Sequence, residues 1–134
     1  MSDFLFVFGT LLSGYDHPMA QRLHAEAELV GPASCQGRLH LVAHYPGIVP
    51  SDDTKDRVAG ELYRVTDDAL MRALDDYEGC GANDAQPYEF ARRVHRVTSG
   101  EREVEAWVYF YDRPVDGFPR IASGDFLRHV AGEA

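Results

Sequence analysis

The stretch Phe4-Leu-Phe-Val-Phe8, followed at once by Gly9-Thr10-Leu11-Leu12-Ser13-Gly14, decides how the chain begins to fold. Five apolar residues in a row can cross a sheet as a buried strand. Because glycine has no Cβ, a turn that opens with Gly9 can bring bare backbone N–H groups against an anionic or carbonyl oxygen. The pattern predicts a buried strand that ends at a candidate ligand-binding turn, although most strand-to-glycine turns are turns only.

Composition narrows the class of partner. The 134 residues and 45% hydrophobic content predict one domain, residues 1–134, with a single core. The formal net charge of −9 opposes binding to a phosphate backbone or to an anionic lipid surface. The apolar start is too short for a signal peptide, and no stretch approaches membrane-spanning length. We therefore expect a cytoplasmic protein with a small-molecule partner, no nucleic acid and no membrane.

The residue types that often carry chemistry are sparse. Cys35 and Cys80 have neither the number nor the spacing of a disulfide framework or a zinc site, which favours reduced thiols. His40 and His44 are the only histidines at a suggestive spacing, and ordinary imidazoles fit them better than metal ligands. The chain has no Gly-x-Ser-x-Gly elbow and no phosphate-binding glycine motif, which disfavours nucleotide binding but leaves other nucleophile arrangements open.

The first half of the chain predicts a short helix and bent strands. Pro18 fits the first turn of a helix that continues through Met19–Ala25. Residues 29–43 are extended but interrupted by glycine and proline, which indicates bulged strands in a barrel-like sheet. The two prolines and the glycine of Tyr45–Pro50 predict a rigid loop, and residues 51–56 predict a hairpin connection.

A strand and an amphipathic helix follow. Arg57–Val65 alternates as a strand does, with Leu62 and Tyr63 on opposite faces. Thr66 is the expected N-cap of a helix over Asp67–Tyr77. Gly79 is expected to end this helix, which puts Glu78 at its last carbonyl groups.

The second half predicts a hairpin and a short closing helix. Tyr88–Val97 and Val104–Tyr111 are expected to pair as antiparallel strands. A last short helix is expected to run to Val130 with Ser123 as its cap. The whole chain is predicted to be one α+β unit in which about six strands dominate two or three short helices.

Glu78 is at the unfavourable end of its predicted helix. A carboxylate beside a helix C-terminus is destabilised by about 0.3–1 kcal/mol at exposed sites. Apolar neighbours would raise its pKa further and let it take and return a proton near neutral pH. Glu78 is therefore the candidate general acid/base, while local sequence alone favours an ordinary solvated carboxylate.

These segments together resemble the gamma-glutamylcyclotransferase-like family, its compact bacterial and gamma-glutamylamine-type members in particular. The matching segments, in order, are Phe8-Gly9-Thr10-Leu11 for Tyr-Gly-Ser/Thr-Leu, Tyr45-Pro46-Gly47, Leu74-Asp-Asp-Tyr-Glu78-Gly79 with Tyr88 after it, Val108-Tyr109, and Arg120-Ile-Ala-Ser-Gly-Asp125. One departure is Phe8, where the family has Tyr before the glycine, so a phenol hydroxyl is missing there.

The resemblance implies a small mixed β-barrel of about six strands with two or three short flanking helices. It also implies an enzyme of the acyltransferase or lyase type that needs no metal and no cofactor. In that chemistry the α-amine of a γ-glutamyl amine or γ-glutamyl amino acid attacks the γ-carbonyl of the same molecule. The products are 5-oxoproline and a free amine.

The resemblance implies roles for individual residues as well. Glu78 would be the acid/base, and the backbone of Phe8, Gly9, Thr10 and Leu11 would hold the glutamyl end of the substrate. Tyr88 and Tyr109 would line the pocket, although packing in the core explains both equally well.

Two other classes of function stay open from the sequence. The same pocket can belong to a non-catalytic small-molecule binding module, since one fold hosts more than one function. An acidic protein-interaction domain has only the net charge in its favour. The loops Tyr45–Asp56 and Gly79–Pro87 are expected to select the leaving amine, whose identity the sequence leaves open together with the oligomeric state.

Overall fold

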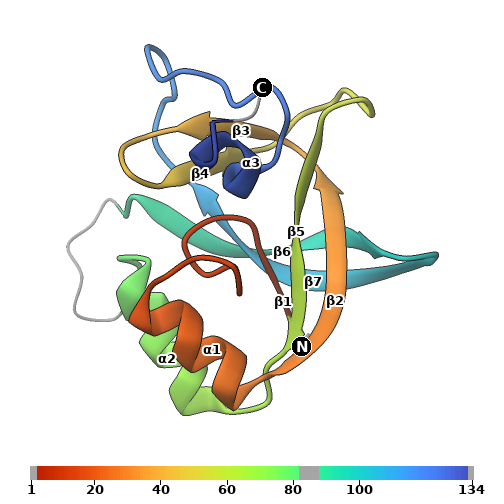
Figure 1. Ribbon diagram of the computed structural model, residues 1–134, viewed down its shortest axis with the longest axis vertical. Helices are drawn as coiled ribbons and strands as arrows, with labels where there is room; N and C mark the ends of the chain where they lie inside the picture. Colours follow the sequence, from red (N-terminus) through yellow and green to blue (C-terminus); the bar gives the residue numbers. More distant parts are fainter. Residues whose placement is uncertain (1–2, 82–87, 133–134) are drawn as a thin grey trace.

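A computed structural model describes residues 3–81 and 88–132 of the chain, and Figure 1 shows their arrangement. No helix in these two ranges is long and apolar enough to cross a membrane. The elements in chain order are β1 (Phe4–Val7), α1 (Pro18–Glu26), β2 (Glu28–Gln36), β3 (Arg38–Leu41), β4 (Pro46–Val49), β5 (Arg57–Arg64), α2 (Asp68–Tyr77), β6 (Phe90–Ser99), β7 (Arg102–Tyr111) and α3 (Phe126–Val130).

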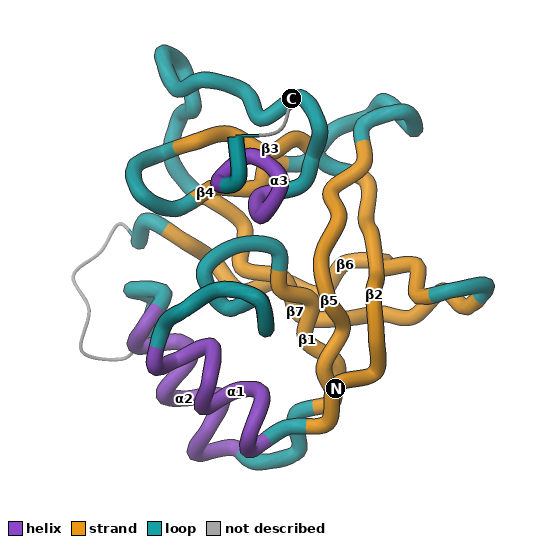
Figure 2. The backbone as a smooth tube through the Cα atoms, viewed as in Figure 1, coloured by secondary structure: helices purple, strands orange, loops and turns teal. Residues whose placement is uncertain are grey.

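Five of the strands close into a mixed barrel. Their order is β1-β5-β2-β6-β7, and a parallel pairing of β1 with β7 at Leu5 and Trp107 closes the ring. β4 continues the sheet from β7, and β3 pairs with β4, so these two strands lie outside the barrel. Helices α1 and α2 pack side by side below the barrel (Figures 1 and 2), and the turn before α3 is joined to β5 by a hydrogen bond from the Ala59 N–H to the Gly124 carbonyl at 2.8 Å. The predicted α+β mixed barrel with short flanking helices is confirmed.

β1 is buried on both of its faces, which explains its unbroken apolar run. Phe6 and Phe8 belong to the core cluster inside the barrel, and Leu5 and Val7 belong to the cluster that faces the helices. The same division places Leu62 and Tyr63 of β5 in different clusters, as the alternation predicts. The helices therefore cover the outer face of the strand that leads into the Gly9 turn.

The region around Pro46 differs from the prediction. Residues predicted as a rigid loop form strand β4, whose first residue is Pro46, a position where a sheet tolerates proline. A Cβ on Gly47 would lie 2.8 Å from the Cβ of Tyr111, so glycine lets β4 pass close to β7. The segment 51–56 joins β4 to β5, and these strands are not neighbours in the sheet, so it is not a hairpin.

Two predicted helix caps are also wrong by one or two residues. The N-cap of α2 is Asp67 instead of Thr66, and its side chain accepts a hydrogen bond from the Ala69 N–H at 2.9 Å. The N-cap of α3 is Asp125 instead of Ser123. Both aspartates supply a carboxylate acceptor near the positive end of the helix, where a charged acceptor is favoured. The predicted hairpin of β6 and β7 is confirmed, with antiparallel pairing from Phe90 with Tyr111 through Ser99 with Arg102.

Candidate active site

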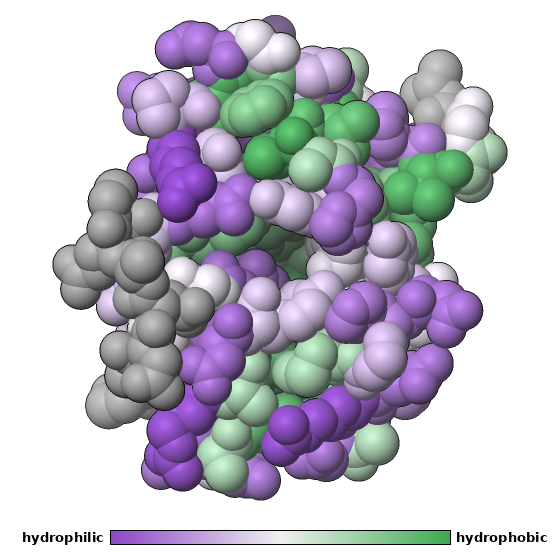
Figure 3. Space-filling model, turned by 90° about the vertical axis from the view of Figure 1, so that its left-hand side faces the viewer, coloured by the Kyte–Doolittle hydropathy of each residue, from purple (hydrophilic) through white to green (hydrophobic). Residues whose placement is uncertain are grey.

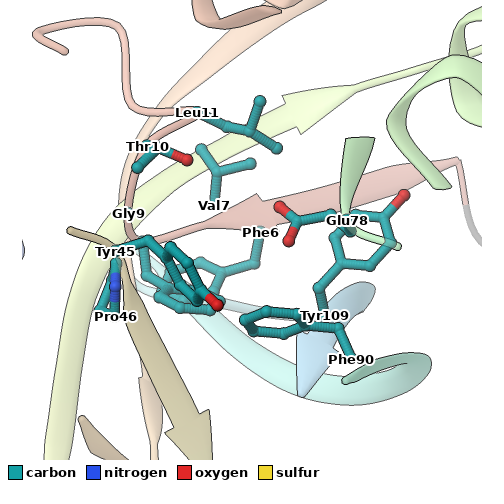
Figure 4. A pocket seen from close by; sticks show the side chains of 11 residues that line it. Phe6, Val7, Gly9, Thr10, Leu11, Tyr45, Pro46, Glu78, Phe90 and Tyr109 are labelled. Carbon is teal, nitrogen blue, oxygen red and sulfur yellow. The ribbon is translucent and has the colours of Figure 1, made fainter. Parts of the chain in front are cut away.

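Two adjoining cavities lie between the β1 turn, β4 and the end of α2. Figure 3 shows a hollow near the middle of one face, and Figure 4 shows the inner part from close by. The inner cavity, of about 340 Å³, is lined by Phe6, Val7, Phe8, Gly9, Thr10, Leu11, Tyr45, Pro46, Glu78, Phe90 and Tyr109. The outer pocket, of about 600 Å³, is lined by Thr10, His17, His44, Tyr45, Tyr77, Glu78, Gly79, Glu89 and Phe90. Both volumes include space open to solvent, and the two adjoin because they share Thr10, Tyr45, Glu78 and Phe90 as lining residues.

The turn after β1 presents its backbone to the inner cavity. The Leu12 N–H donates to the Gly9 carbonyl at 3.1 Å and closes the turn. Within the described part of the chain, the N–H groups of Gly9, Thr10 and Leu11 donate to no acceptor. A Cβ on Gly9 would lie 2.7 Å from Pro46 Cγ, so only glycine fits without displacing β4. The turn thus offers backbone donors that a carboxylate or carbonyl oxygen of a ligand can use.

The Phe8 side chain packs with the core. Its ring centroid lies 6.2 Å from that of Phe6 in a stacked arrangement, and the residue is 7% exposed. The position at which the family pattern has Tyr therefore contributes an apolar wall and its backbone here.

The fold of α2 places Glu78 at the cavity. Leu70 and Leu74 are fully buried and fix the helix against the barrel. The Glu78 N–H still donates to the Leu74 carbonyl at 2.9 Å, and Gly79 then turns the chain away with φ of 75°. The Glu78 carboxyl group lies at the cavity, across from the Gly9 turn (Figure 4).

The surroundings of Glu78 make its carboxyl group a weak acid. The residue is half-buried, and its carboxyl group lies beside the rings of Phe90 and Tyr109. Burial, and then the negative charges of Glu89 and Asp75, raise its pKa to about 8. A carboxyl group with this pKa can accept and return a proton near neutral pH.

A hydrogen bond joins the two halves of the cavity wall. The Thr10 Oγ1 atom lies 2.7 Å from the Tyr77 hydroxyl oxygen. Tyr77 also contacts the ring of His17 edge-on, with centroids 5.0 Å apart. The Gly9 turn is thus tied directly to the last residue of α2, next to Glu78.

A second network turns the Tyr109 hydroxyl toward Asp75. That hydroxyl donates to Asp75 Oδ1 at 2.7 Å. Arg92 donates to both carboxylate oxygens of Asp75, at 2.8 and 3.2 Å, and its guanidinium lies 4.4 Å from the centroid of the Trp107 ring. Burial, and then the hydrogen bond to Asp75, raise the pKa of Tyr109 well above its usual range. The Tyr109 ring lines the inner cavity beside Glu78 (Figure 4).

The structure brings together most of the residues singled out in the sequence. Tyr88 is half-buried just before β6 and is not among the residues that line either cavity. Sequence reasoning missed Phe90, the first residue of β6, and gave Tyr45 no place in the wall of the site. Of the predicted site residues, Phe8, Gly9, Thr10, Leu11, Glu78 and Tyr109 line the inner cavity.

In the described part of the chain, the histidines and cysteines are not grouped into a metal site. In the two described ranges, no three His, Cys, Asp or Glu side chains are grouped closely enough to hold a metal ion. His40 Nδ1 lies 3.2 Å from the Phe118 carbonyl oxygen, whereas His44 packs edge-on against the Tyr45 ring. Neither Cys35 nor Cys80 is part of a disulfide, and burial raises the pKa of Cys35 to about 12.

Comparisons with known proteins agree on one family. The family model described as "Gamma-glutamyl cyclotransferase, AIG2-like" matches residues 5–128. The gamma-glutamylcyclotransferase family protein YtfP of Escherichia coli K12 is 37% identical over 126 residues, which are 92% of this chain and 95% of the relative. The solution structure of E. coli ytfP matches with a TM-score of 0.63 and 34% identity over 95% of this chain and 98% of that chain. The crystal structure of an AIG2-like protein from Mus musculus shares the fold, with a TM-score of 0.71 and 23% identity over 88% of this chain and 84% of that one.

Proposed function

Because the chain belongs to the gamma-glutamyl cyclotransferase, AIG2-like family, we propose that it converts a γ-glutamyl amine or a γ-glutamyl amino acid into 5-oxoproline and a free amine. One observation carries the proposal: the Glu78 carboxyl group and the backbone of the Gly9 turn line the same cavity. A proton carrier and a set of oxygen-binding N–H groups are what this aminolysis requires.

In the proposed complex, the turn binds the glutamyl end of the substrate. The N–H groups of Gly9, Thr10 and Leu11 donate to its carboxylate or to the carbonyl oxygen on which negative charge develops. Preorganised donors of this kind are valuable, because losing one typically costs about 10²–10³ in rate. The rings of Phe90 and Tyr109 exclude water from the reacting atoms and strengthen these hydrogen bonds.

Glu78 carries the proton between the two nitrogen atoms. Its carboxylate takes a proton from the substrate's α-ammonium group, and the freed amine forms a bond to the γ-carbonyl carbon. The tetrahedral oxyanion then collapses, the bond from that carbon to the leaving nitrogen breaks, and Glu78 returns the proton to that nitrogen. Glu78 next takes the second proton that the ring nitrogen must lose and passes it to the released amine, which departs as an ammonium ion. Protons balance over the cycle, and no covalent bond forms with the protein.

Ring closure needs little beyond conformational control. The nucleophile and the electrophile belong to one molecule, and well-oriented intramolecular reactions reach effective molarities of about 10⁵–10⁸ M. The main task of the inner cavity is to hold the glutamyl group bent, with its amine facing its own carbonyl carbon and Glu78.

A panel of γ-glutamyl compounds tests this function. The purified protein is incubated with γ-glutamyl amines and γ-glutamyl amino acids, and 5-oxoproline and free amine are quantified together. Formation of both in a one-to-one ratio supports the proposal. Glutamate in place of 5-oxoproline contradicts it, because that product comes from hydrolysis. No turnover, together with thermal stabilisation by the same compounds, would favour the binding-module alternative.

A further inference from the structure

The outer pocket is lined by acidic side chains and, among the described residues, by no Lys or Arg. The acidic groups are the Glu89 carboxylate and the Glu78 carboxyl group. The Nδ1 atom of His17 accepts a hydrogen bond from the Met19 N–H at 3.0 Å, so this side of the ring is already paired within the protein. The pocket that opens beyond Glu78 is thus a negatively charged one.

Glu89 is held in place at this pocket by its neighbours. The Tyr45 hydroxyl donates to its Oε2 atom. The Asp112 N–H donates to its backbone carbonyl at 2.7 Å, which fixes the residue at the edge of the sheet just before β6. Because Tyr45 lines both cavities, its hydrogen bond holds the Glu89 carboxylate in the outer pocket next to a residue that the inner cavity shares.

Two arginines lie near this pocket, and neither is among its described lining residues. Arg113 acts electrostatically on Tyr45, but it is exposed, where water screens it, and it does not line the pocket. Arg92 binds both oxygens of Asp75 in an ion pair of its own. A positively charged ligand group in the outer pocket would therefore meet Glu89 without a competing protein cation among the described lining residues.

We infer that the outer pocket selects leaving amines that carry a second, positively charged group, with Glu89 as the residue that sets this preference. The inference rests on the proposed function, which places the glutamyl end in the inner cavity and the leaving amine on the far side of Glu78. A second ammonium group can donate a charge-assisted hydrogen bond to Glu89. A leaving group that ends in a carboxylate is repelled instead.

Three substrates of matched length test the preference. They are the mono-γ-glutamyl amides of 1,4-diaminobutane, n-pentylamine and 4-aminobutanoic acid, whose far ends are cationic, neutral and anionic. We expect kcat/KM to fall in that order, by about ten-fold or more from first to last, and the spread to shrink in high salt. Free 1,4-diaminobutane should inhibit more strongly than free n-pentylamine, a readout that requires no variant.

Glu89→Gln tests the assigned residue, because glutamine keeps the shape and removes the charge. The ratio of kcat/KM between the cationic and the anionic amide should narrow several-fold. This ratio is compared within each protein, so it cancels the change in the pKa of Glu78 that loss of the Glu89 charge causes for all substrates alike. The matched control is Glu103→Gln, which removes a largely exposed carboxylate from the tip of the β6–β7 hairpin and should leave the order unchanged. A spread that persists in Glu89→Gln would overturn the role of Glu89.

The outcomes separate the two proposals. If all three amides yield 5-oxoproline at similar kcat/KM, the charge preference is wrong and the proposed function stands. If none yields 5-oxoproline while a broader panel of γ-glutamyl amino acids does, the charge preference is again wrong. If no γ-glutamyl compound yields 5-oxoproline, the proposed function falls and the inference falls with it.

Discussion

Thr10 and Tyr77, which are 67 residues apart in the chain, are joined by side-chain oxygens 2.7 Å apart. Thr10 belongs to the turn that offers backbone N–H groups. Tyr77 is the last residue of α2, and Glu78 follows it as the C-cap residue. This hydrogen bond directly links the proposed oxygen-binding turn to the helix that carries the proposed proton carrier. Two sequence features that are weak when taken singly thereby become parts of one site.

Removing this hydrogen bond should lower activity and stability without abolishing either. We expect Tyr77→Phe to lower kcat/KM by about three- to ten-fold and the free energy of unfolding by about 1 kcal/mol, the usual net worth of such a bond. Thr10→Val removes the same bond from the other side. Kinetic measurements on the two single variants and the double variant should give strongly non-additive effects. Strict additivity would show that the contact does not couple the turn to α2.

The pH dependence of activity should follow the ionisation of Glu78. Because its pKa is raised to about 8, most of the free protein holds a neutral carboxyl group at pH 7, and the fraction able to accept a proton grows as pH rises. We expect kcat/KM to increase with pH through an apparent pKa near 8. A profile that is already flat above pH 6 would mean that Glu78 ionises as an ordinary glutamate.

The same group should make stability depend on pH. The folded pKa of Glu78 lies above its ordinary value, so folding retains a proton that the unfolded chain loses between about pH 4.5 and 8. The wild type is therefore favoured at the low end of this window and loses that stability as pH rises through it. Relative to Glu78→Gln, we expect its free energy of unfolding to fall by roughly 1–3 kcal/mol between pH 5 and pH 9. Urea unfolding at both pH values measures the difference, and parallel pH dependences would contradict the raised pKa.

A methyl group on Gly9 should damage the turn. Its Cβ would lie 2.7 Å from Pro46 Cγ, so either the turn or β4 must move. We expect Gly9→Ala to cost about 1–3 kcal/mol of stability and to raise KM, because the backbone N–H groups shift. Gly14→Ala is the control, since its new Cβ meets only the flexible end of Leu127, at 3.1 Å. Equal KM values for the two variants would show that the turn does not bind substrate.

The sequence predicts the features that depend on local pattern. The apolar run Phe4–Phe8 indicates a buried strand because every position along it is apolar. Glu78 follows from a helix with Leu70 and Leu74 on one stripe and Gly79 as its end. These features depend only on the spacing of residue types along the chain, so they can be predicted from the sequence.

The remaining features depend on contacts that spacing does not encode. Strand β4 is defined by its pairing with β3 and β7, and Gly47 allows its close approach to Tyr111. A proline-rich segment gives no periodic signal for such pairing. Phe90 joins the cavity through the hairpin pairing of β6 and β7, and Tyr88, two residues earlier, does not line it. In both cases the outcome depends on which strands pair in the folded sheet.

The most direct test of the central claim is the initial rate of 5-oxoproline formation by wild type, Glu78→Gln and Asp76→Asn on the best γ-glutamyl substrate. Asp76 is an exposed carboxylate two residues before Glu78, so its variant controls for loss of charge alone. If Glu78 carries the proton, Glu78→Gln should lose about 10²–10⁴-fold in kcat while Asp76→Asn stays near wild type. A folded Glu78→Gln variant with wild-type kcat would contradict the account.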